Sequence, residues 1–315
     1  MLIGKEEFCD FKTIQEAINY IEAEMNHDQF ITLTILEGIY KEQVMIRRSR
    51  IRLKGLGNVV ISNGAYAKQT DEYDHEIGTF ATATLYLDGI DVHLENITIE
   101  NTAGQGEDVG QAIALYANCD VSTFTNCQFK GHQDTLFTSC LPDKQKDGTD
   151  FPVDRPVHEQ YRQYYLNCMI EGTVDFIFGG GTAYFEQCLI KNKARKHTHP
   201  GYMTAANTPK GQQYGFVFNK CIIVTEEHAA PIYLGRPWRP YAKVRFQHCR
   251  MSDNIQEARW HAWNKNENHY TAEFEEVFTE QPNFSEGYSN AWGSTGRIVD
   301  QTNLKPADVL TEIFY

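Results

Sequence analysis

The sequence predicts an all-β protein, a single-stranded right-handed parallel β-helix whose coils stack along one axis. The main observation is a pattern of six residues: an aromatic residue, two spacers, a cysteine, a spacer and an apolar residue. It occurs five times, at residues 124–129, 165–170, 185–190, 218–223 and 246–251. The irregular distance between copies is typical of a solenoid with loops of variable length. No helical periods of about 10 to 15 residues separate the apolar runs, which disfavours alternating strands and helices.

A short amphipathic helix is expected at the N-terminus. Thr13 and Glu16 have the spacing of a capping box. Apolar residues then recur at helical spacing, at Ile14, Ala17, Ile18, Ile21 and Met25. Because a solenoid must cover its open end, we interpret residues 13–25 as a helical cap.

From residue 30 onward the sequence consists of short runs of β-branched and aromatic residues. The predicted strands are residues 31–36, 51–53, 59–61, 84–87, 92–94 and 97–99, and Ile97 occupies the cysteine position of an earlier repeat. Polar insertions at residues 63–79, 141–160 and 192–202 are expected to gather on one face and wall a groove. Pro306 can open a second helix, reaching Ile313, as a further cap.

One domain is therefore expected over residues 1–315, with a helical cap at about 13–25, a β-helix at about 30–255 and a C-terminal tail at about 256–315. The repeat favours one long array over two domains. Five of the eight cysteines share one phase of the repeat between apolar neighbours. We expect these to be reduced thiols in the core rather than disulfides.

Bulk properties limit the partners. Lys and Arg number 29 against 42 acidic residues, a net charge of −13, so nucleic acid and anionic membranes are poor partners. No apolar run approaches the roughly 20 residues of a membrane helix. The first ten residues lack the apolar stretch of a secretory signal, which favours a cytoplasmic location as the sequence stands, or an extracellular one if a leader was removed.

Two aspartates are candidates for catalysis. Asp134 and Asp175 each lie seven residues after a repeat cysteine. If their coils are neighbours, two carboxylates face the same way about one strand spacing, 5 Å, apart. Such a pair suits acid, base or nucleophilic work, because like charges raise one pKa and leave the other carboxylate ionised. The alternative is that each aspartate bonds to amides of its own turn.

Arg236 and Trp238 form a second candidate cluster, in the segment Leu-Gly-Arg-Pro-Trp at residues 234–238. A guanidinium can grip a carboxylate through two hydrogen bonds and so orient a catalytic aspartate. An indole is a natural platform for the apolar face of a sugar. A surface arginine and a core tryptophan are the plainer alternatives.

Five segments together resemble the signature segments of the pectin methylesterase (pectinesterase) family of carbohydrate esterases, in the family's order. They are Gly-Ile-Tyr-Lys-Glu at 38–42, Gln-Ala-Ile-Ala-Leu at 111–115, Gln-Asp-Thr-Leu at 133–136, Asp-Phe-Ile-Phe-Gly at 175–179 and the segment at 234–238. The resemblance spans roughly residues 11–263. The family's fold is a right-handed parallel β-helix, in agreement with the repeat.

The resemblance implies hydrolysis of galacturonate methyl esters in pectin or methylated oligogalacturonides, with release of methanol. Asp175 would be the nucleophile and Asp134 the general acid and base. Gln111 and Gln133 would donate to the oxyanion, and Arg236 would orient Asp175. The mechanism needs side chains and water, so no cofactor or metal is expected, and a monomer is expected.

Groove residues are also implied by the resemblance. Phe178, Trp238 and Trp260 match positions that line the family's sugar groove, and Tyr202 and Met203 follow an insertion that is expected to border it. One departure is Arg259, where the family often has glycine.

Three rival functions stay open at this point. A β-helical glycosidase or lyase would cut the polymer without releasing methanol, although two glutamines beside the acids favour an oxyanion. An esterase of the same fold could take a non-sugar ester or thioester. A noncatalytic binding solenoid has no reason to keep all five catalytic residues. The pair His197 and His199 is interpreted as solvated rather than as metal ligands.

Overall fold

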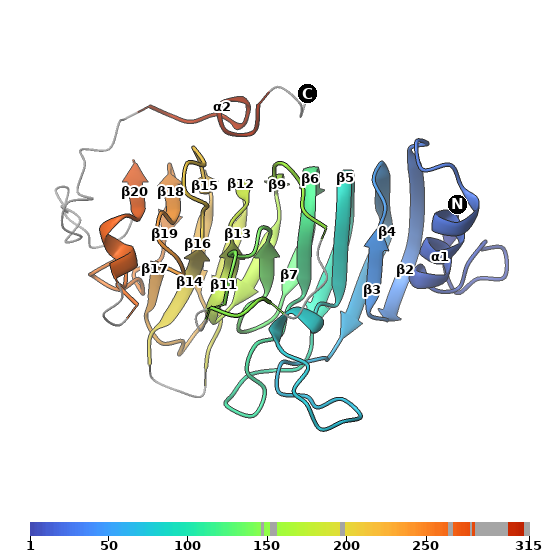
Figure 1. Ribbon diagram of the computed structural model, residues 1–315, viewed down its shortest axis with the longest axis horizontal. Helices are drawn as coiled ribbons and strands as arrows, with labels where there is room; N and C mark the ends of the chain where they lie inside the picture. The colour runs from blue at the N-terminus through green and yellow to red at the C-terminus, as the bar shows by residue number, and fades with distance from the viewer. Residues whose placement is uncertain are drawn as a thin grey trace.

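The computed structural model describes residues 1–145, 148–151, 156–195, 199–263, 267–277, 279–280 and 302–311. These residues form a right-handed parallel β-helix, as the repeat predicted. Figure 1 shows its strands side by side, from the N-terminal coil at one end to β20 at the other. The named strands pair in parallel, each with the strands one coil before and after it.

Each coil contributes to three faces of the solenoid. The first face contains β3 (Val44–Arg47), the start of β5 (Leu85–Asn101), the start of β6 (Leu115–Thr125), β8 (Leu136–Thr138), β11 (Val174–Gly179), β14 (Gly201–Ala206) and β17 (Ile232–Pro237). The second contains β1 (Leu2–Ile3), the starts of β2 (Ile31–Lys41) and β4 (Ile51–Asn63), later parts of β5 and β6, β9 (Arg162–Leu166), β12 (Thr182–Glu186), β15 (Phe216–Asn219), β18 (Lys243–Gln247) and β20 (Glu273–Val277). The third contains the ends of β2, β4 and β5, then β7 (Gln128–Lys130), β10 (Met169–Gly172), β13 (Leu189–Asn192), β16 (Ile222–Thr225) and β19 (Arg250–Met251).

The six predicted strand runs all fall within these strands, except that Thr84 immediately precedes β5. Because β2, β4 and β5 continue around corners of the coil, runs that were expected separately merge into long bent strands. Ile97 does occupy the cysteine position, since Thr98 pairs with Gln128, the residue after Cys127.

The repeat builds two ladders inside the solenoid. Its aromatic rings stack face to face with centroids 4.4 to 4.6 Å apart, and they are Phe124, Tyr165, Phe185, Phe218 and Phe246. The cysteines one step along are buried, and four of them approach a carbonyl of the preceding coil, as Cys168 Sγ does with Phe124 O at 3.2 Å. All eight cysteines are free thiols, and the five of the repeat are buried in the core, as predicted for those five.

A tight corner precedes each repeat cysteine. The residue at this corner has a φ of 52 to 54°, in the left-handed region, and the five residues are Asn126, Asn167, Gln187, Lys220 and His248. Non-glycine residues adopt this region rarely, since it brings Cβ close to the backbone. The stacked rings before the corner and the buried thiol after it hold the chain in this turn.

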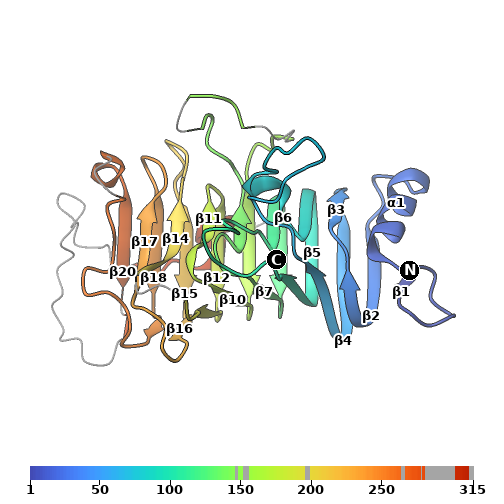
Figure 2. The ribbon, with the colours of Figure 1, turned by 90° about the horizontal axis from the view of Figure 1, so that it is seen from below.

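The N-terminal helix caps the solenoid as expected. Helix α1 (Ile14–Glu24) buries Ile14, Ala17, Ile18 and Ile21 in the main core, and Figure 2 shows it at the end of the coil stack. Thr13 Oγ accepts from the Glu16 N–H at 3.2 Å, so half of the predicted capping box is present. The Glu42 carboxylate accepts from the first two helical N–H groups, which have no partner within the helix.

The C-terminal prediction was wrong in two respects. Strand β20 pairs with β18, so the solenoid continues beyond residue 255. Helix α2 (Pro306–Leu310) does not cap the stack but packs Val309 and Leu310 against Tyr184 and Val217 on its outer side, since the apolar partners lie there. Ile313, the expected end of this helix, lies outside the described residues. Neither α1 nor α2, the α-helices of the described residues, is suited in length and apolarity to crossing a membrane.

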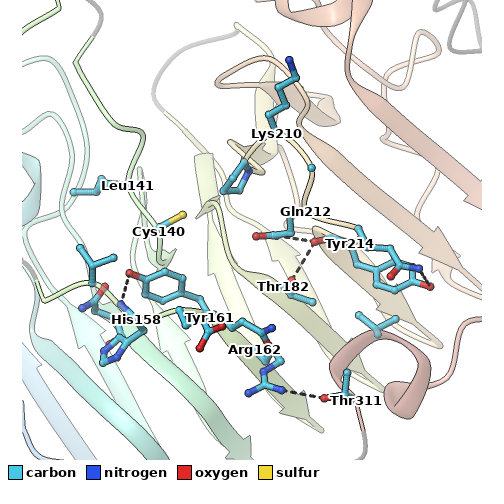
Figure 3. A pocket seen from close by; sticks show the side chains of 18 of the residues that line it. Cys140, Leu141, His158, Tyr161, Arg162, Thr182, Lys210, Gln212, Tyr214 and Thr311 are labelled. Atoms are coloured by element: carbon cyan, nitrogen blue, oxygen red, sulfur yellow. Dashed lines mark hydrogen bonds between the residues drawn. The ribbon is translucent and has the colours of Figure 1, made fainter.

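A hollow of about 630 Å³ lies beside α2 (Figure 3). Two basic side chains that line it have acidic partners. Arg162 binds Asp120 through two hydrogen bonds and donates to Thr311 Oγ1, at 2.9 Å. His158 Nε2 lies 2.8 Å from Asp88 Oδ1. The bond to Thr311 and the packing of Val309 and Leu310 anchor residues 302–311 to the solenoid.

Candidate active site

Strand register brings the two aspartates together on the first face. Gln133 bridges Val174, and Leu136 pairs with Ile177, so the two coils keep one constant offset. That offset places Asp134 directly opposite Asp175 on neighbouring coils. The prediction that they share one phase of the repeat is confirmed.

The backbone at both aspartates is unusual. Asp134 has a φ of 64° and Asp175 a φ of 49°, both in the left-handed region. Around Asp175 the register against β14 shifts, because Val174 pairs with Tyr202 and Ile177 with Thr204. Three steps on one strand thus face two on the other, which is a β-bulge. Such bulges redirect a side chain, and here the carboxylate is directed out of the solenoid into a pocket.

Arg236 binds Asp175 from two coils away. Its Nε lies 2.9 Å from Oδ1 and its Nη2 2.6 Å from Oδ2, a bidentate charge-assisted pair. In register, Arg236 faces Ala205 and Ala205 faces Phe178. The methyl group of Ala205 is small enough for the arginine to lie across it. The guanidinium favours the ionised carboxylate and fixes both of its oxygens.

Asp134 has the opposite electrostatic setting. Its side chain is buried, and this loss of hydration raises its pKa well above the usual value. The negative charge of Asp175 raises it further, while Arg236 acts against the shift. Burial and the neighbouring charge therefore favour a protonated Asp134, whereas the pair with Arg236 favours an ionised Asp175, the arrangement in which one acid donates and the other attacks.

This shift predicts a pH dependence of stability. Folding favours protonated Asp134, so its contribution is fully present below the unfolded-state pKa of about 3.9 and is lost as pH rises through the folded-state value. Relative to Asp134→Asn, whose amide does not titrate, the free energy of unfolding of the parent should fall as pH rises over that window. Urea denaturation of both proteins across pH measures the difference, and a difference independent of pH would contradict the shift.

Gln111 and Gln133 line the same pocket of about 420 Å³ as the two aspartates and Arg236. Gln133 immediately precedes Asp134, and Gln111 lies one coil earlier, where the neighbouring Ala112 N–H donates to Gln133 O at 3.2 Å. Both side chains are half-buried. Their amide groups can therefore donate to a negative oxygen placed beside the aspartates.

An aromatic wall closes one side of this pocket. It includes Phe80 of η1 (Thr79–Ala81), Phe151, Phe178, Trp238 and Trp263. Phe80 packs edge to face on Phe151 with centroids 5.5 Å apart, and Phe178 contacts Trp238 at 5.8 Å. Phe178 and Trp238 were predicted from the sequence.

A second pocket, of about 490 Å³, continues the first beyond Gln111 and Gln133, which line both. Its side chains include Lys68, Arg195 and His199. The insertions at 63–79, 141–160 and 192–202 all contribute to these two pockets, so the prediction that they wall one groove is confirmed. His199 lies in this groove, whereas residues 196–198 are outside the described part. In the described residues no cluster of three His, Cys, Asp or Glu side chains is arranged to hold a metal.

Three groove predictions, Met203, Trp260 and Tyr202, were wrong. Met203 is fully buried in the main core, since it points inward from β14. Trp260 is 1% exposed and stacks on Phe274 with centroids 4.5 Å apart. The tryptophan of this motif that lines the groove is Trp263, three residues later. Tyr202 lines neither pocket but lies against Arg236.

Arg259 explains why the aromatic motif turns this way. Its φ of 58° is a conformation that glycine adopts without strain, which accounts for the glycine that the family often has there. In this chain the arginine is 3% exposed and binds the Glu276 carboxylate of β20 through its Nε at 3.0 Å. The ion pair ties the turn that presents Trp263 to the last strand.

Phe80, Phe151 and Trp263 were missed by sequence reasoning. Phe80 and Phe151 are aromatic residues in or beside polar insertions, and that contrast was the available signal. For Trp263 the sequence offered two tryptophans three residues apart, and burial decided between them.

The β-helix places an aspartate paired with an arginine, a buried aspartate with a raised pKa and two glutamine amides in one pocket, a set that suits a carboxylic ester hydrolase. The family model described as Pectinesterase matches residues 1–145 and 156–309. Pectinesterase 31 of Arabidopsis thaliana is 32% identical over 87% of this chain and 80% of its own length. The chain belongs to the pectinesterase family.

Further relatives and structures agree. Pectinesterase/pectinesterase inhibitor U1 of Solanum lycopersicum is 31% identical over 84% of this chain, which spans 42% of that longer protein. The solved structure of pectin methylesterase from carrot has a TM-score of 0.77 at 26% identity, covering 94% of this chain and 86% of that one. A pectin methylesterase in complex with a hexasaccharide has a TM-score of 0.76 at 24% identity over 99% and 96% of the two chains, which supports the fold.

Proposed function

We propose that this protein hydrolyses methyl esters of galacturonate units in pectin or methylated oligogalacturonides, releasing methanol and leaving free carboxylates. The observation that carries the proposal is the asymmetric carboxyl pair, with Asp175 held by Arg236 and Asp134 buried beside it with a raised pKa. Family membership and the aromatic wall of the pocket support a sugar ester as substrate.

In the first step Asp175 attacks the carbonyl carbon of the methyl ester. A bond forms between a carboxylate oxygen and that carbon, and the carbonyl electrons move to oxygen. When the tetrahedral intermediate collapses, the bond to the methoxy oxygen breaks and Asp134 gives its proton to this oxygen. Methanol leaves, Asp134 is ionised, and a galacturonyl anhydride of Asp175 is left on the enzyme.

In the second step Asp134 acts as a base and water attacks the acylated enzyme. Asp134, now a carboxylate, takes a proton from water as the water oxygen attacks the acyl carbon. The bond to Asp175 breaks, the galacturonate carboxyl group is released, and Asp175 is a carboxylate again. Protonated Asp134 is restored, so the cycle consumes one water and needs no other reactant.

Gln111 and Gln133 are proposed to stabilise the negative oxygen of the tetrahedral intermediate in each of the two steps. Removing one donor of this kind typically lowers kcat by about 100- to 1,000-fold. We expect Gln133→Ala and Gln111→Ala each to show a loss of this order in steady-state methanol release, with a smaller change in KM. Gln212→Ala, whose amide binds carbonyl groups away from the pocket, serves as the control. Unchanged kcat in both pocket variants would remove the amides from the mechanism.

Three quantities measured together test the proposed function. Highly methylated pectin is incubated with the parent, and methanol, reducing ends and polymer viscosity are followed. Methanol without new reducing ends is expected. New reducing ends without methanol would indicate a glycosidase or lyase, and faster cleavage of an acyl thioester than of methylated pectin would indicate the thioesterase alternative.

The preferred chain length is a narrower proposal. Gln145 and Phe151 of the long insertion wall the groove, and Arg239 Nη2 donates to Lys144 O at 3.3 Å, joining this insertion to the segment after β17. We propose that this junction narrows the groove and favours short methylated oligomers, and comparable turnover on long pectin would count against it. The expected monomeric state and cellular location stay predictions.

A further inference from the structure

The guanidinium of Arg236 lies between two aromatic rings. Its central carbon is 3.7 Å from the centroid of the Tyr202 ring and 3.8 Å from that of Trp263. Its edge meanwhile makes the two hydrogen bonds to Asp175. A planar cation prefers this arrangement, because ring faces attract its charge while its N–H groups keep their acceptors.

The two rings are themselves held in place. Tyr202 stacks on Tyr233 with centroids 5.5 Å apart and planes 9° apart. The His261 ring lies beside both tyrosines, with ring centroids 5.3 Å from Tyr202 and 5.1 Å from Tyr233. His261 Nδ1 also accepts from the Trp263 backbone N–H at 3.1 Å. One histidine thus joins the two sides of the sandwich.

Tyr202 has no place in the pocket itself. It does not line either half of the groove, so it is positioned to act on the arginine rather than on substrate. Trp263 does line the pocket, and substitutions there would mix both effects. Tyr202 is therefore the cleaner probe.

We propose, on the basis of the function proposed above, that Tyr202 and Trp263 are positioning residues that keep Arg236 in place while Asp175 is acylated. During that interval Asp175 forms an anhydride and carries no negative charge, so the ion pair that holds Arg236 in the resting enzyme is lost. The ring contacts do not depend on that charge. They keep the guanidinium where Asp175 must regain its charge as a leaving carboxylate, and they thereby speed the second step.

Three variants test the clamp: Tyr202→Leu removes the ring, Tyr202→Phe keeps it, and Tyr164→Leu removes a half-buried outward tyrosine ring from β9 as a control. Rapid-quench and steady-state methanol release are measured on a highly methylated oligogalacturonide. For Tyr202→Leu we expect kcat and KM to fall together about tenfold, with kcat/KM unchanged, and a burst of one methanol per enzyme before the slow phase. Tyr202→Phe should restore kcat to within about twofold, as expected if the ring face carries the effect. Tyr164→Leu should match the parent.

The outcomes separate this inference from the proposed function. A parent that releases no methanol refutes the function. A parent that is active while the Leu and Phe variants of Tyr202 have equal kcat refutes the clamp. If Tyr202→Leu slows the first turnover and shows no burst of methanol, the role of the ring in the acylated state is refuted. The melting temperatures of the two Leu variants are compared to separate an effect on stability from an effect on the reaction. A kinetic loss in Tyr164→Leu equal to that in Tyr202→Leu would refute a specific role for Tyr202.

Discussion

Asp175→Asn is expected to lower methanol release by at least about a thousandfold, because an amide does not attack an ester and the acylated intermediate no longer forms. Asp175→Ala should give the same loss. The assay is methanol released from highly methylated pectin, with folding followed by circular dichroism. Release at the parental rate would require another nucleophile.

The chain offers a matched control for this variant. Asp120 and Arg162 form a bidentate pair with the same burial, since the carboxylates are each 9% exposed and the arginines 13% and 14% exposed. Asp120→Asn should therefore lower the melting temperature as Asp175→Asn does, because both leave a buried guanidinium without its charge partner. It should retain methanol release. Equal loss of activity in both variants would mean that the effect comes from stability.

Asp134→Asn is expected to lower kcat by about 100- to 10,000-fold, the range associated with a general acid and base. An asparagine gives no proton to departing methoxide and takes none from water. A galacturonate nitrophenyl ester separates these roles, because its leaving group needs no proton. The first turnover of this ester should be restored in the variant while the second step stays slow. Equal slowing of the first turnover on methyl and nitrophenyl esters would contradict the acid role.

The raised pKa of Asp134 gives this pair a defined pH dependence. Protonated Asp134 is the active acid, so the rate of the first step in the parent should fall as pH rises through the raised pKa. The Asp134→Asn variant should lack this alkaline limb. Single-turnover methanol release across pH measures it, and an alkaline limb retained unchanged in the variant would assign the titration to another group.

Much of the fold followed from local sequence. The ring and cysteine repeat fixed the coil, because an inward position in a stacked solenoid accepts an aromatic or small apolar side chain and little else. Thr13 and the apolar period after it similarly specified α1. Helix α2 was misplaced, since it is only five residues long and buries only Val309 and Leu310, and the sequence does not show which distant surface accepts them.

The site followed from sequence to a different extent for each residue. The equal distance of Asp134 and Asp175 from their cysteines predicted that they share a phase, because coil geometry converts that spacing into direct register. Their unequal electrostatic settings depend on burial and on the placement of Arg236, which lies 61 positions along the chain from Asp175. Spacing carries no information on which carboxyl group is desolvated.

The sequence alone thus determined the solenoid, the carboxyl pair and, through five ordered segments, the family. Tertiary structure decided which aromatic residues face the groove. Trp260 and Trp263 are alike in type and neighbourhood, but Arg259 turns the backbone with a φ of 58° and sends the first into the core and the second to Arg236. The orientation of a side chain near a corner depends on contacts with distant strands, here the Arg259 pair with Glu276, and no local pattern records such contacts.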